Sequence, residues 1–428
     1  MSNRHSLRPT AEPAFDNVTS DLTLDHERDG RRWLRIGMVA PPVVRIPPAK
    51  YAGTERIVAA LADGLVARGH YVRLFASGDS TAGSETIPVI PEAAWNGHSS
   101  GDNGPFAMLA AMSALEHADG LDLFHTHLDV MGLPLVRRAA LPVLTTFHAR
   151  LDLPGIFEAV HAFGDAPLVA ISESQRRWHP DANWVATIPH GLPLREMPSS
   201  DRAGDYLAVV GRASPDKGIA EAIEVAKAAA LPLRIAAKAL DPAERAYVAS
   251  VITPALGDGV QFLGELGPTE RDPLLAGALA TLMLGAWPEP FGLVAIESLA
   301  TGTPVIARRA GALPEIVAHG IDGFLVDDLR EAGLAIRLAA GLDRARIRER
   351  AIARFDVERM VTAYERLYRS LVGDRSERVA RLGQDGRDGN DGRDRSDGRD
   401  VHDARPHPAV RPLVGIRVEG GPTRSGNR

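Results

Sequence analysis

Two carboxylates in the segment from Pro288 to Glu297, with seven residues between them, have the spacing expected for binding an extended sugar ligand. Pro288 and Pro290 keep the chain extended at Glu289, and apolar residues at helical spacing predict a helix from Gly292 onward. We therefore expect Glu289 on the entering loop and Glu297 one turn into the helix, about 8 to 12 Å away. Such carboxylates can accept hydrogen bonds from different hydroxyls of one long ligand. Helix capping and simple solvation are the alternative.

A pair of cations, Arg212 and Lys217, follows the apolar run that ends at Gly211. Residues 216–218 open a predicted helix, so both cations are expected at the carboxyl edge of a sheet, beside the positive end of a helix. An arginine fork and a lysine ammonium there can hold a diphosphate and stabilise the charge that it gains as a leaving group. Ordinary surface salt bridges are the alternative interpretation.

Three other positions stand next to predicted strands and helices. Gly311 precedes a helix whose free amides can take phosphate oxygens, although a tight turn explains it equally well. Gly53 either lets its loop pass close to a ligand or only relieves turn strain. His148 follows a buried strand and can hydrogen-bond a sugar hydroxyl, with a structural role as the alternative. His125 and His127 end another strand, but without a carboxylate in register they are a weak metal signal, so no metal is predicted.

Composition restricts the class of protein. A chain of 428 residues, 45% of them hydrophobic, can bury two cores. The absence of cysteine excludes disulfides, thiol nucleophiles and thiolate metal sites. The net charge of -6 argues against a nucleic-acid partner. Residues 1–32 have no apolar stretch of signal-peptide length, and the longest apolar run, 276–287, is too short to cross a bilayer, which predicts a cytoplasmic protein without a transmembrane segment.

Short apolar runs alternate with helical patterns in two sets, which predicts an α/β protein with two Rossmann-like, doubly wound domains. Because such sheets bind ligands at the carboxyl ends of their strands, the domains are expected to face each other across a cleft. No G-x-G-x-x-G motif follows the first strand, which counts against a nicotinamide enzyme. The predicted strands lie near residues 34–39, 71–76, 121–125, 143–147 and 168–171 in the first set, and near 206–211, 233–236, 260–263, 280–284 and 304–306 in the second.

Four motifs in order over residues 34–371 resemble the retaining GT-B glycosyltransferases of the large family four, the glycosyl transferases group 1. The resemblance implies transfer of a sugar from a nucleotide diphosphate sugar with retention, by front-face attack in which the leaving phosphate takes the acceptor proton. It also implies that neither a divalent cation nor another cofactor is needed, and the chain has no Asp-X-Asp motif. The motifs are Tyr51-Ala52-Gly53-Thr54-Glu55-Arg56, Thr146-Phe147-His148-Ala149, Gly211-Arg212 with Lys217-Gly218, and Glu289 to Glu297 followed by Gly302-Thr303-Pro304-Val305.

The resemblance also implies residue roles. Glu289 would contact the donor sugar, Arg212 and Lys217 the diphosphate, and His148 would lie beside the sugar. The other donor-binding residues would be Glu297, at the ribose, with Gly53, Phe291, Gly292, Leu293 and Gly311. The donor nucleotide stays open, and so does the acceptor, which can be a glycan, a lipid-linked molecule or a small molecule.

The predicted organisation has five parts, which include two disordered tails because the tails lack the apolar residues that offset chain entropy. The C-terminal tail repeats Asp-Gly-Arg units. The parts are a disordered tail over 1–32, an N-terminal Rossmann-like acceptor-side domain over 33–195, a C-terminal nucleotide-sugar-binding domain over 196–355, a helix over 356–372 that braces the N-terminal domain, and a disordered Asp/Gly/Arg-rich tail over 373–428.

Two departures from the family pattern bear on activity. Ala52 stands where a glycine is usual, and its methyl could crowd the donor phosphate. Thr301 stands where a smaller residue is usual, which affects helix packing only. Two alternatives to a transferase follow: a nucleotide-sugar-binding protein that has lost turnover, and a nucleotide-sugar epimerase, which shares the architecture but usually needs additional acids and bases around the sugar.

Overall fold

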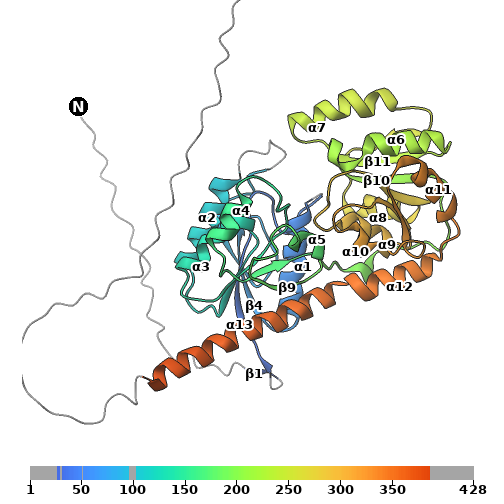
Figure 1. Cartoon of the computed structure of the whole chain (residues 1–428). Helices are drawn as coiled ribbons and strands as arrows, with labels where there is room; N and C mark the ends of the chain where they lie inside the picture. The colour runs from blue at the N-terminus through green and yellow to red at the C-terminus, as the bar shows by residue number, and fades with distance from the viewer. Residues whose placement is uncertain (1–26, 29–30, 51, 96–102, 386–428) are drawn as a thin grey trace, which may run out of the picture. The chain divides into compact units, whose positions relative to one another are not determined.

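The computed structural model describes residues 27–28, 31–50, 52–95 and 103–385. Described residues up to Glu377 form one compact unit, which contains two parallel β-sheets (Figure 1). The predicted disorder of residues 1–26 and 386–428 lies outside the described residues. Within the described ranges, no helix combines the length and the apolar character needed to cross a bilayer.

The first sheet has seven strands in the order β5-β4-β3-β6-β7-β8-β9. Strand β3 lies inside the sheet because its residues are apolar toward both faces: Ile36 and Val39, which point to opposite faces, are both fully buried. The strands are β3 (Arg35–Val39), β4 (Tyr71–Ser77), β5 (Glu85–Ile90), β6 (Leu123–Thr126), β7 (Val143–Thr146), β8 (Leu168–Ala170) and β9 (Trp184–Thr187). The helices of this domain are α1 (Gly53–Ala67), α2 (Gly104–Glu116), η1 (Asp129–Gly132), α3 (Pro134–Arg138), α4 (Ile156–Ala162), α5 (Glu173–Arg176) and η2 (Leu194–Glu196).

The second sheet has six strands in the order β12-β11-β10-β13-β14-β15. They are β10 (Leu207–Arg212), β11 (Leu233–Lys238), β12 (Val260–Phe262), β13 (Ala280–Met283), β14 (Val305–Arg308) and β15 (Gly323–Val326). The helices are η3 (Pro215–Lys217), α6 (Ile219–Ala228), α7 (Pro242–Tyr247), the π-helical turn η4 (Val248–Ile252), η5 (Thr253–Ala255), α8 (Pro268–Ala276), α9 (Leu293–Ala300), α10 (Leu313–Ile316), α11 (Leu329–Ala339) and α12 (Arg344–Phe355).

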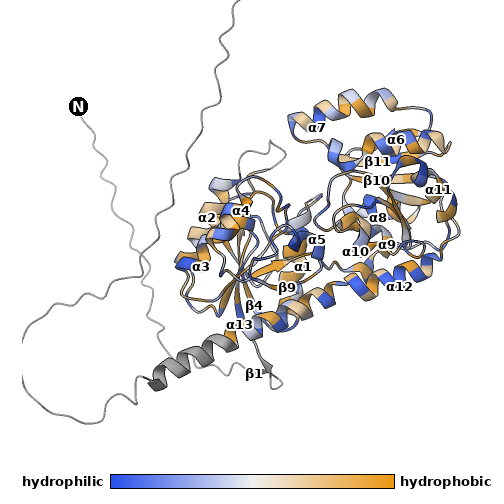
Figure 2. Ribbon diagram, viewed as in Figure 1, coloured by the Kyte–Doolittle hydropathy of each residue, from blue (hydrophilic) through white to orange (hydrophobic). Residues whose placement is uncertain are grey.

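Both sheets are doubly wound, as predicted. In each, the first strand along the chain has its next two strands on one side and the later strands on the other, so the winding reverses beside β3 and beside β10. Ligands of such folds bind at this reversal, outside the carboxyl ends of the strands. In Figure 2 helix α12 shows blue stretches, from its charged residues, beside orange ones from its apolar residues.

Within the two parallel sheets, three strands were not predicted: β5, β9 and β15. All three are edge strands with weak sequence signals. Strand β5 contains Pro88 and has no fully buried residue, β9 is partly exposed, and β15 begins at Gly323. Strands β5 and β9 are partly exposed and therefore lack the continuous apolar pattern of the central strands, whereas β15 is buried but has only three apolar residues after its glycine.

Helix α13 (Val357–Asp385) packs against the first sheet's domain. Its buried residues share one hydrophobic core with residues of α1, β3, β4 and α9. Gly64 of α1 lies so close to α13 that a Cβ there would be 2.5 Å from Val361 Cγ2. The buried residues of α13 are Met360, Val361, Tyr364 and Tyr368.

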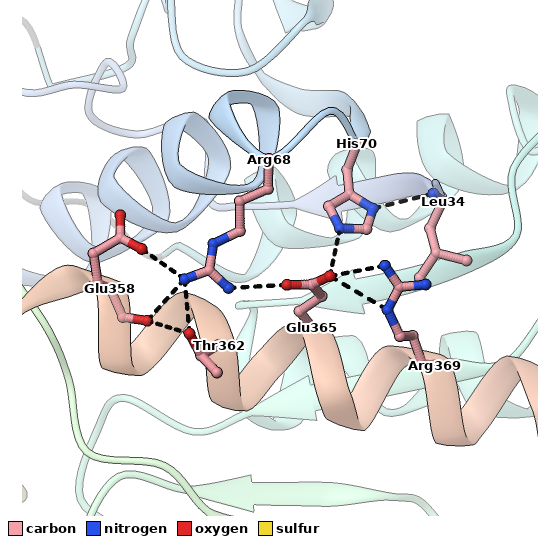
Figure 3. A network of polar contacts seen from close by, with 7 residues as sticks. All are labelled: Leu34, Arg68, His70, Glu358, Thr362, Glu365 and Arg369. Atoms are coloured by element: carbon pink, nitrogen blue, oxygen red, sulfur yellow. Dashed lines mark hydrogen bonds and ion pairs between the residues drawn. The ribbon is translucent and has the colours of Figure 1, made fainter. Parts of the chain in front are cut away.

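Polar contacts also join α13 to the first domain (Figure 3). Arg68, just after α1, donates hydrogen bonds to Glu365 at 2.9 Å and to Glu358 at 2.6 Å. Burial opposes ionisation of Glu365, but hydrogen bonds from Arg369 and Arg68 outweigh it and lower its pKa to about 2. The His70 Nε2 atom lies 3.4 Å from the same carboxylate. Glu365 is therefore an ionised anchor shared by three basic side chains.

Parts of the predicted tails are ordered elements. The disordered tail was predicted from residue 373, but α13 continues to Asp385. Residues 374–384 contain three arginines together with Glu377, Ala380 and Leu382, which favour helices, and the Asp-Gly-Arg repeat begins only at 385–386. Residues 27–28 and 31–32, inside the predicted N-terminal tail, pair as the antiparallel strands β1 (Glu27–Arg28) and β2 (Arg31–Arg32). The Asp-Gly pair between them is a typical hairpin turn sequence.

Candidate active site

A cavity lies where the carboxyl ends of the two sheets meet. Residues after β3, β7, β8 and β9 line it from the first domain, and residues after β10 and β13 line it from the second. The lining residues include Ala52, Gly53, Thr54, Arg56, His148, Ile171, His190, Asp216, Lys217, Arg271, Gly285, Trp287, Glu289, Pro290, Phe291, Gly292, Leu293, Glu297 and Leu313.

Lys217 and Glu289 form an ion pair in this cavity. Lys217 ends η3, just after β10, and Glu289 lies on the loop before α9. The Lys217 Nζ atom donates to Glu289 Oε1, and each side chain is only 16% exposed. The same ammonium lies 5.8 Å from the centre of the Trp287 ring. The cation and the acid that were predicted to hold different parts of one ligand thus neutralise each other here.

Two glycines allow other loops to approach the backbone of the loop that carries Glu289. Gly218 has φ +68°, and a Cβ there would be 2.2 Å from the backbone nitrogen of Gly285. Gly311 has φ +57°, and a Cβ there would be 2.3 Å from the carbonyl oxygen of Glu289. The N–H of Ala312 donates to that oxygen at 2.8 Å. Gly311 is not among the lining residues, so in this structure it supports the Glu289 loop from behind.

Glu297 lies on α9 inside the cavity, as predicted, and is only 1% exposed. Its Oε1 atom is 2.5 Å from an Arg56 nitrogen and 3.0 Å from an Arg271 nitrogen. Arg271 also contacts Asp272 at 2.7 Å. Because Arg56 belongs to α1 and Arg271 to α8, the buried Glu297 carboxylate joins the two domains.

Arg212 is the predicted cation that the structure does not bring into the cavity. Its guanidinium lies 3.1 Å from Asp216 and 3.9 Å from Glu244, and its side chain is 36% exposed. Arg212 is absent from the cavity lining, whereas Asp216 lines it. The strand-end position was correctly expected, but the sequence pattern did not reveal that Asp216 and Glu244 would pair with the Arg212 side chain and hold it outside the cavity lining.

His148 lines the cavity at the end of β7, and Asp129 fixes its backbone. The Asp129 Oδ1 atom accepts from the N–H of His148 at 2.7 Å and from that of Ala149 at 3.3 Å. Burial raises the pKa of Asp129 to about 6 and lowers the pKa of His148 to about 3. The His148 ring is therefore neutral at physiological pH.

Three further histidines surround His148. Its Nε2 atom lies 2.8 Å from His127 Nδ1, and its ring stacks on His190 with centroids 5.0 Å apart. His125 contacts Tyr368 through Nδ1 at 2.6 Å and the Thr146 hydroxyl through Nε2 at 2.7 Å. Burial holds the pKa values of His125, His127 and His190 well below the usual range. Across the described ranges, no group of three or more histidine or acidic side chains is arranged to hold a metal ion.

The remaining predicted residues also line the cavity. Gly53 is the first residue of α1, and a Cβ there would be 3.5 Å from Leu293 Cδ1, which is ordinary contact. Phe291 is buried, with its ring 5.1 Å from that of His190, and Gly292 precedes α9. Ala52 has φ -165°, an extended conformation open to any residue, so its methyl strains no backbone but does face the cavity.

The lining residues that the sequence predictions missed include Arg56, Arg271, His190 and Trp287. Arg56 stands inside a recognised motif and could have been found from its place one turn into α1. His190 follows β9, so it was lost with that edge strand. Arg271 and Trp287 carry no pattern of their own, because only the folded chain brings them to the cavity.

Two facing Rossmann-like sheets that share a cavity at their carboxyl ends define the GT-B class. The profile "Glycosyltransferase Family 4" matches residues 51–192, and "Glycosyl transferases group 1" matches residues 195–354. D-inositol 3-phosphate glycosyltransferase of Mycolicibacterium smegmatis is 30% identical over 341 residues, which cover 65% of this chain and 76% of that protein. The chain belongs to the family-four glycosyltransferases, as its motifs predicted.

Two other proteins show the extent of the similarity. Phosphatidyl-myo-inositol mannosyltransferase of Mycobacterium tuberculosis is 25% identical over 395 residues, covering 79% of this chain and 98% of that protein. The structure of Anabaena HepE in complex with UDP-glucose superimposes with a TM-score of 0.60 at 18% identity, over 79% of this chain and all of that one. The latter similarity concerns the fold alone.

Proposed function

We propose that this glycosyltransferase moves a sugar from a nucleotide diphosphate sugar to an acceptor, with retention of the anomeric configuration and without a metal ion. The observation that carries the proposal is the Lys217–Glu289 ion pair inside a cavity shared by both domains. A donor of this kind has an anionic diphosphate next to a neutral, hydroxyl-rich ring. It can therefore satisfy both members of the pair separately.

When the donor binds, Lys217 and Glu289 each exchange the other for a group of the donor, so neither is left without a partner. A diphosphate oxygen replaces the Glu289 carboxylate at the Lys217 ammonium, which keeps a charge-assisted hydrogen bond on the cation. The carboxylate is then available to accept hydrogen bonds from sugar hydroxyls. The UDP-glucose complex of HepE, a protein of the same fold, supports a nucleotide sugar as the donor.

Arg212 is assigned as the second diphosphate cation even though it now pairs with Asp216. That pair is partly exposed, at 36% and 20%, and exposed ion pairs contribute only about 0.2–1 kcal/mol. A charge-assisted hydrogen bond from the guanidinium to a phosphate contributes about 1.5–3 kcal/mol. Rotation of Arg212 from Asp216 to a bound diphosphate is therefore favourable.

The other donor contacts follow from position. Glu297 is assigned to the ribose, since its carboxylate lines the cavity about one helical turn beyond the sugar-contacting loop. Gly292 and Leu293 stand at the start of α9, where backbone N–H groups have no helical partner and can meet phosphate oxygens. Gly53 and Phe291 contribute cavity wall, and Gly311 contributes by supporting the Glu289 loop.

The charges in the cavity support retention by front-face attack. The described lining residues include three carboxylates, Asp216, Glu289 and Glu297, and each one is paired with a cation. A carboxylate held in this way is a poor nucleophile for a covalent intermediate. Lys217 and Arg212 would stabilise the leaving diphosphate, which supports transfer without a divalent ion.

The test combines a donor panel with an analysis of the product. Purified protein is incubated with UDP-, GDP- and ADP-sugars and an acceptor panel that contains glycans, lipid-linked acceptors and small polyols. We expect hydrolysis or transfer from one donor, a product anomer that matches the donor by NMR, and loss of both in Glu289→Ala and Lys217→Met. Interconversion of free nucleotide sugars without acceptor would identify an epimerase, and tight donor binding without turnover a binding protein.

A thermal-shift screen can find the donor before any acceptor is known. A ligand present at 100 times its Kd adds about 2.7 kcal/mol to the unfolding free energy, which is a readily measured rise in Tm. We also propose the cytoplasmic location that was predicted from the sequence, and cell fractionation tests this location.

A further inference from the structure

One carboxylate of the second domain bonds to the backbone of the first domain. Glu315 lies on α10, and its two oxygens accept hydrogen bonds from the N–H groups of Glu173 at 2.8 Å and Ser174 at 2.6 Å. These two residues begin α5 of the first domain, which lies against α10 (Figure 1). The Arg177 guanidinium, also of the first domain, lies 3.9 Å from the same carboxylate. The contact therefore depends on the arrangement of the two domains.

The backbone of Glu315 is fixed within its own domain. Arg354 of α12 donates to the Ile316 carbonyl at 2.8 Å and also to the carbonyl of Glu315. Leu313, at the start of α10, is buried and lines the cavity, whereas Glu315 is not among the described lining residues. A ligand in the cavity therefore does not have to displace Glu315 from α5.

Helix α5 links Glu315 to the segment that carries His148. Gln175 of α5 is only 2% exposed. Its Nε2 atom donates to the carbonyl oxygen of Phe147 at 3.2 Å and to that of Ala149 at 2.9 Å. These two carbonyls flank His148, so the position of α5 determines the position of the backbone that carries this histidine.

The residue before α5 contacts the loop that carries Glu289. The Ser172 hydroxyl donates to the Pro290 carbonyl at 2.7 Å and accepts from the N–H of Gln175 at 3.0 Å. Pro290 follows Glu289 directly. Ser172 and α5 thus connect the loops of His148 and Glu289, which belong to different domains, through a continuous set of hydrogen bonds.

We propose that Glu315 is a positioning residue that holds the two domains in the closed arrangement seen here and so keeps His148 and Glu289 at one cavity. The roles of His148 and Glu289 at the sugar rest on the proposed function, whereas the contact between Glu315 and α5 does not. The Glu315 side chain is 32% exposed, so water can replace the N–H groups of α5 when the domains separate. The contact therefore favours closure without preventing opening.

The first test measures the separation of the domains in the full chain without any ligand. Because the chain has no cysteine, Glu116→Cys on α2 and Arg337→Cys on α11 provide one exposed site for a spin label in each domain. Double electron–electron resonance should give one dominant distance, which becomes longer and more broadly distributed when Glu315→Ala is added. Equal distributions with and without this substitution would overturn the proposal, whether or not the protein transfers sugar.

Glu331→Ala is the matched control for the distance measurement. The Glu331 carboxylate also accepts a backbone N–H, that of Asp327 at 2.7 Å, but both residues belong to the second domain. This substitution should leave the distance between the labels unchanged.

The second test separates positioning from folding. We expect Glu315→Ala to lower kcat/KM for sugar transfer about 3- to 30-fold, mainly through kcat, because fewer molecules are closed. Glu315→Gln keeps one acceptor oxygen and should have an intermediate effect. The affinity for a nucleoside diphosphate should stay within about threefold in both variants, since Lys217 lies in the second domain and is unchanged.

A merely structural role for Glu315 gives a different result. In that case Glu315→Ala would lower the Tm and the diphosphate affinity together while the distance between the domains stayed the same, which would refute the proposal. Absence of turnover in the wild type would count against the proposed function, and the distance measurement would still decide the role of Glu315.

Discussion

Replacing Glu289 by glutamine removes a charge from the cavity while it preserves the shape of the side chain. In the wild type, the Lys217 ammonium is bonded to this carboxylate, so an incoming diphosphate must displace it. The variant Glu289→Gln should therefore bind a nucleoside diphosphate without sugar more tightly than the wild type. At the same time it should transfer sugar poorly, because a neutral amide is a weaker acceptor for sugar hydroxyls.

The size of the effect follows from the burial of the pair. Exposed ion pairs contribute about 0.2–1 kcal/mol, and removing one partner of a fully buried pair costs about 3–5 kcal/mol. Lys217 and Glu289 are each 16% exposed, between these limits. We therefore expect that breaking the Lys217–Glu289 pair costs about 1–2 kcal/mol. Without this cost, the nucleoside diphosphate binds about 5- to 30-fold more tightly. The lost hydrogen bonds to a charged acceptor, at about 1.5–3 kcal/mol, predict a 10- to 150-fold lower kcat/KM.

Isothermal titration with UDP, GDP and ADP measures the affinity for the nucleoside diphosphate, and steady-state kinetics of sugar transfer measures kcat/KM. Lys217→Met should weaken both, since it removes the cation. Asp327→Asn is the matched control, because Asp327 pairs with Arg309 at 3.3 Å on the exposed surface, with the side chains 64% and 46% exposed. This control should leave diphosphate affinity unchanged.

Glu289→Gln is expected to raise the affinity for a nucleoside diphosphate and to lower the rate of sugar transfer, so the two measurements test Lys217 and Glu289 separately. If Glu289→Gln binds every nucleoside diphosphate as weakly as the wild type, then a diphosphate does not have to break the Lys217–Glu289 ion pair in order to bind. If the variant binds the diphosphate more tightly but transfers sugar at the full rate, Lys217 is correctly assigned and Glu289 is not.

Three further predictions concern the metal, the pH dependence and the brace helix. Saturating EDTA should leave the transfer rate unchanged, and a loss restored by Mn²⁺ or Mg²⁺ would contradict the proposed mechanism. Burial lowers the pKa of His148 from 6.5 to about 3, so the unfolded chain binds a proton first as the pH falls. The folded state should thus lose about 2 kcal/mol between pH 7.5 and 5 through this residue, and denaturant unfolding of His148→Asn should show a smaller loss. Arg68→Met should lower the unfolding free energy by about 1–3 kcal/mol, because Arg68 bonds the mostly buried Glu365 of α13. The control Arg330→Met, from a pair 92% and 45% exposed, should change it by less than about 0.5 kcal/mol.

The central strands could be predicted from the sequence because burial on both faces leaves a continuous apolar run. Strand β3 shows this pattern, and so does β10. Edge strands such as β9 have one neighbour and no such run, so their positions depend on pairing that the sequence does not display. The extension of α13 was missed for a different reason: composition was averaged over the whole tail, although its helix-forming residues end only where the glycine repeat begins.

The site was predictable wherever a side chain follows a central strand or begins a helix. Lys217, Glu289, Glu297 and His148 occupy such positions, and all four line one cavity. The orientation of a side chain is different, since it depends on which of several possible partners the folded chain brings into contact with it. Arg212 shows this limit, because Asp216 and Glu244 hold it outside the lining.

The contacts that join the two domains at the cavity involve the same segments that the ligand is proposed to occupy. Arg56 reaches across to the buried Glu297 at 2.5 Å, and the Ser172 hydroxyl donates to the Pro290 carbonyl at 2.7 Å, one residue beyond Glu289. Under the proposed function, donor binding and domain contact would therefore compete for Glu297 and for the Glu289 loop. Arg271 lies in the same domain as Glu297 and contacts its carboxylate at 3.0 Å, so the carboxylate keeps a cationic partner if Arg56 withdraws. The exchange of Arg56 for a ribose hydroxyl thus leaves no buried charge without a partner, and this makes opening of the domains compatible with a preformed donor site.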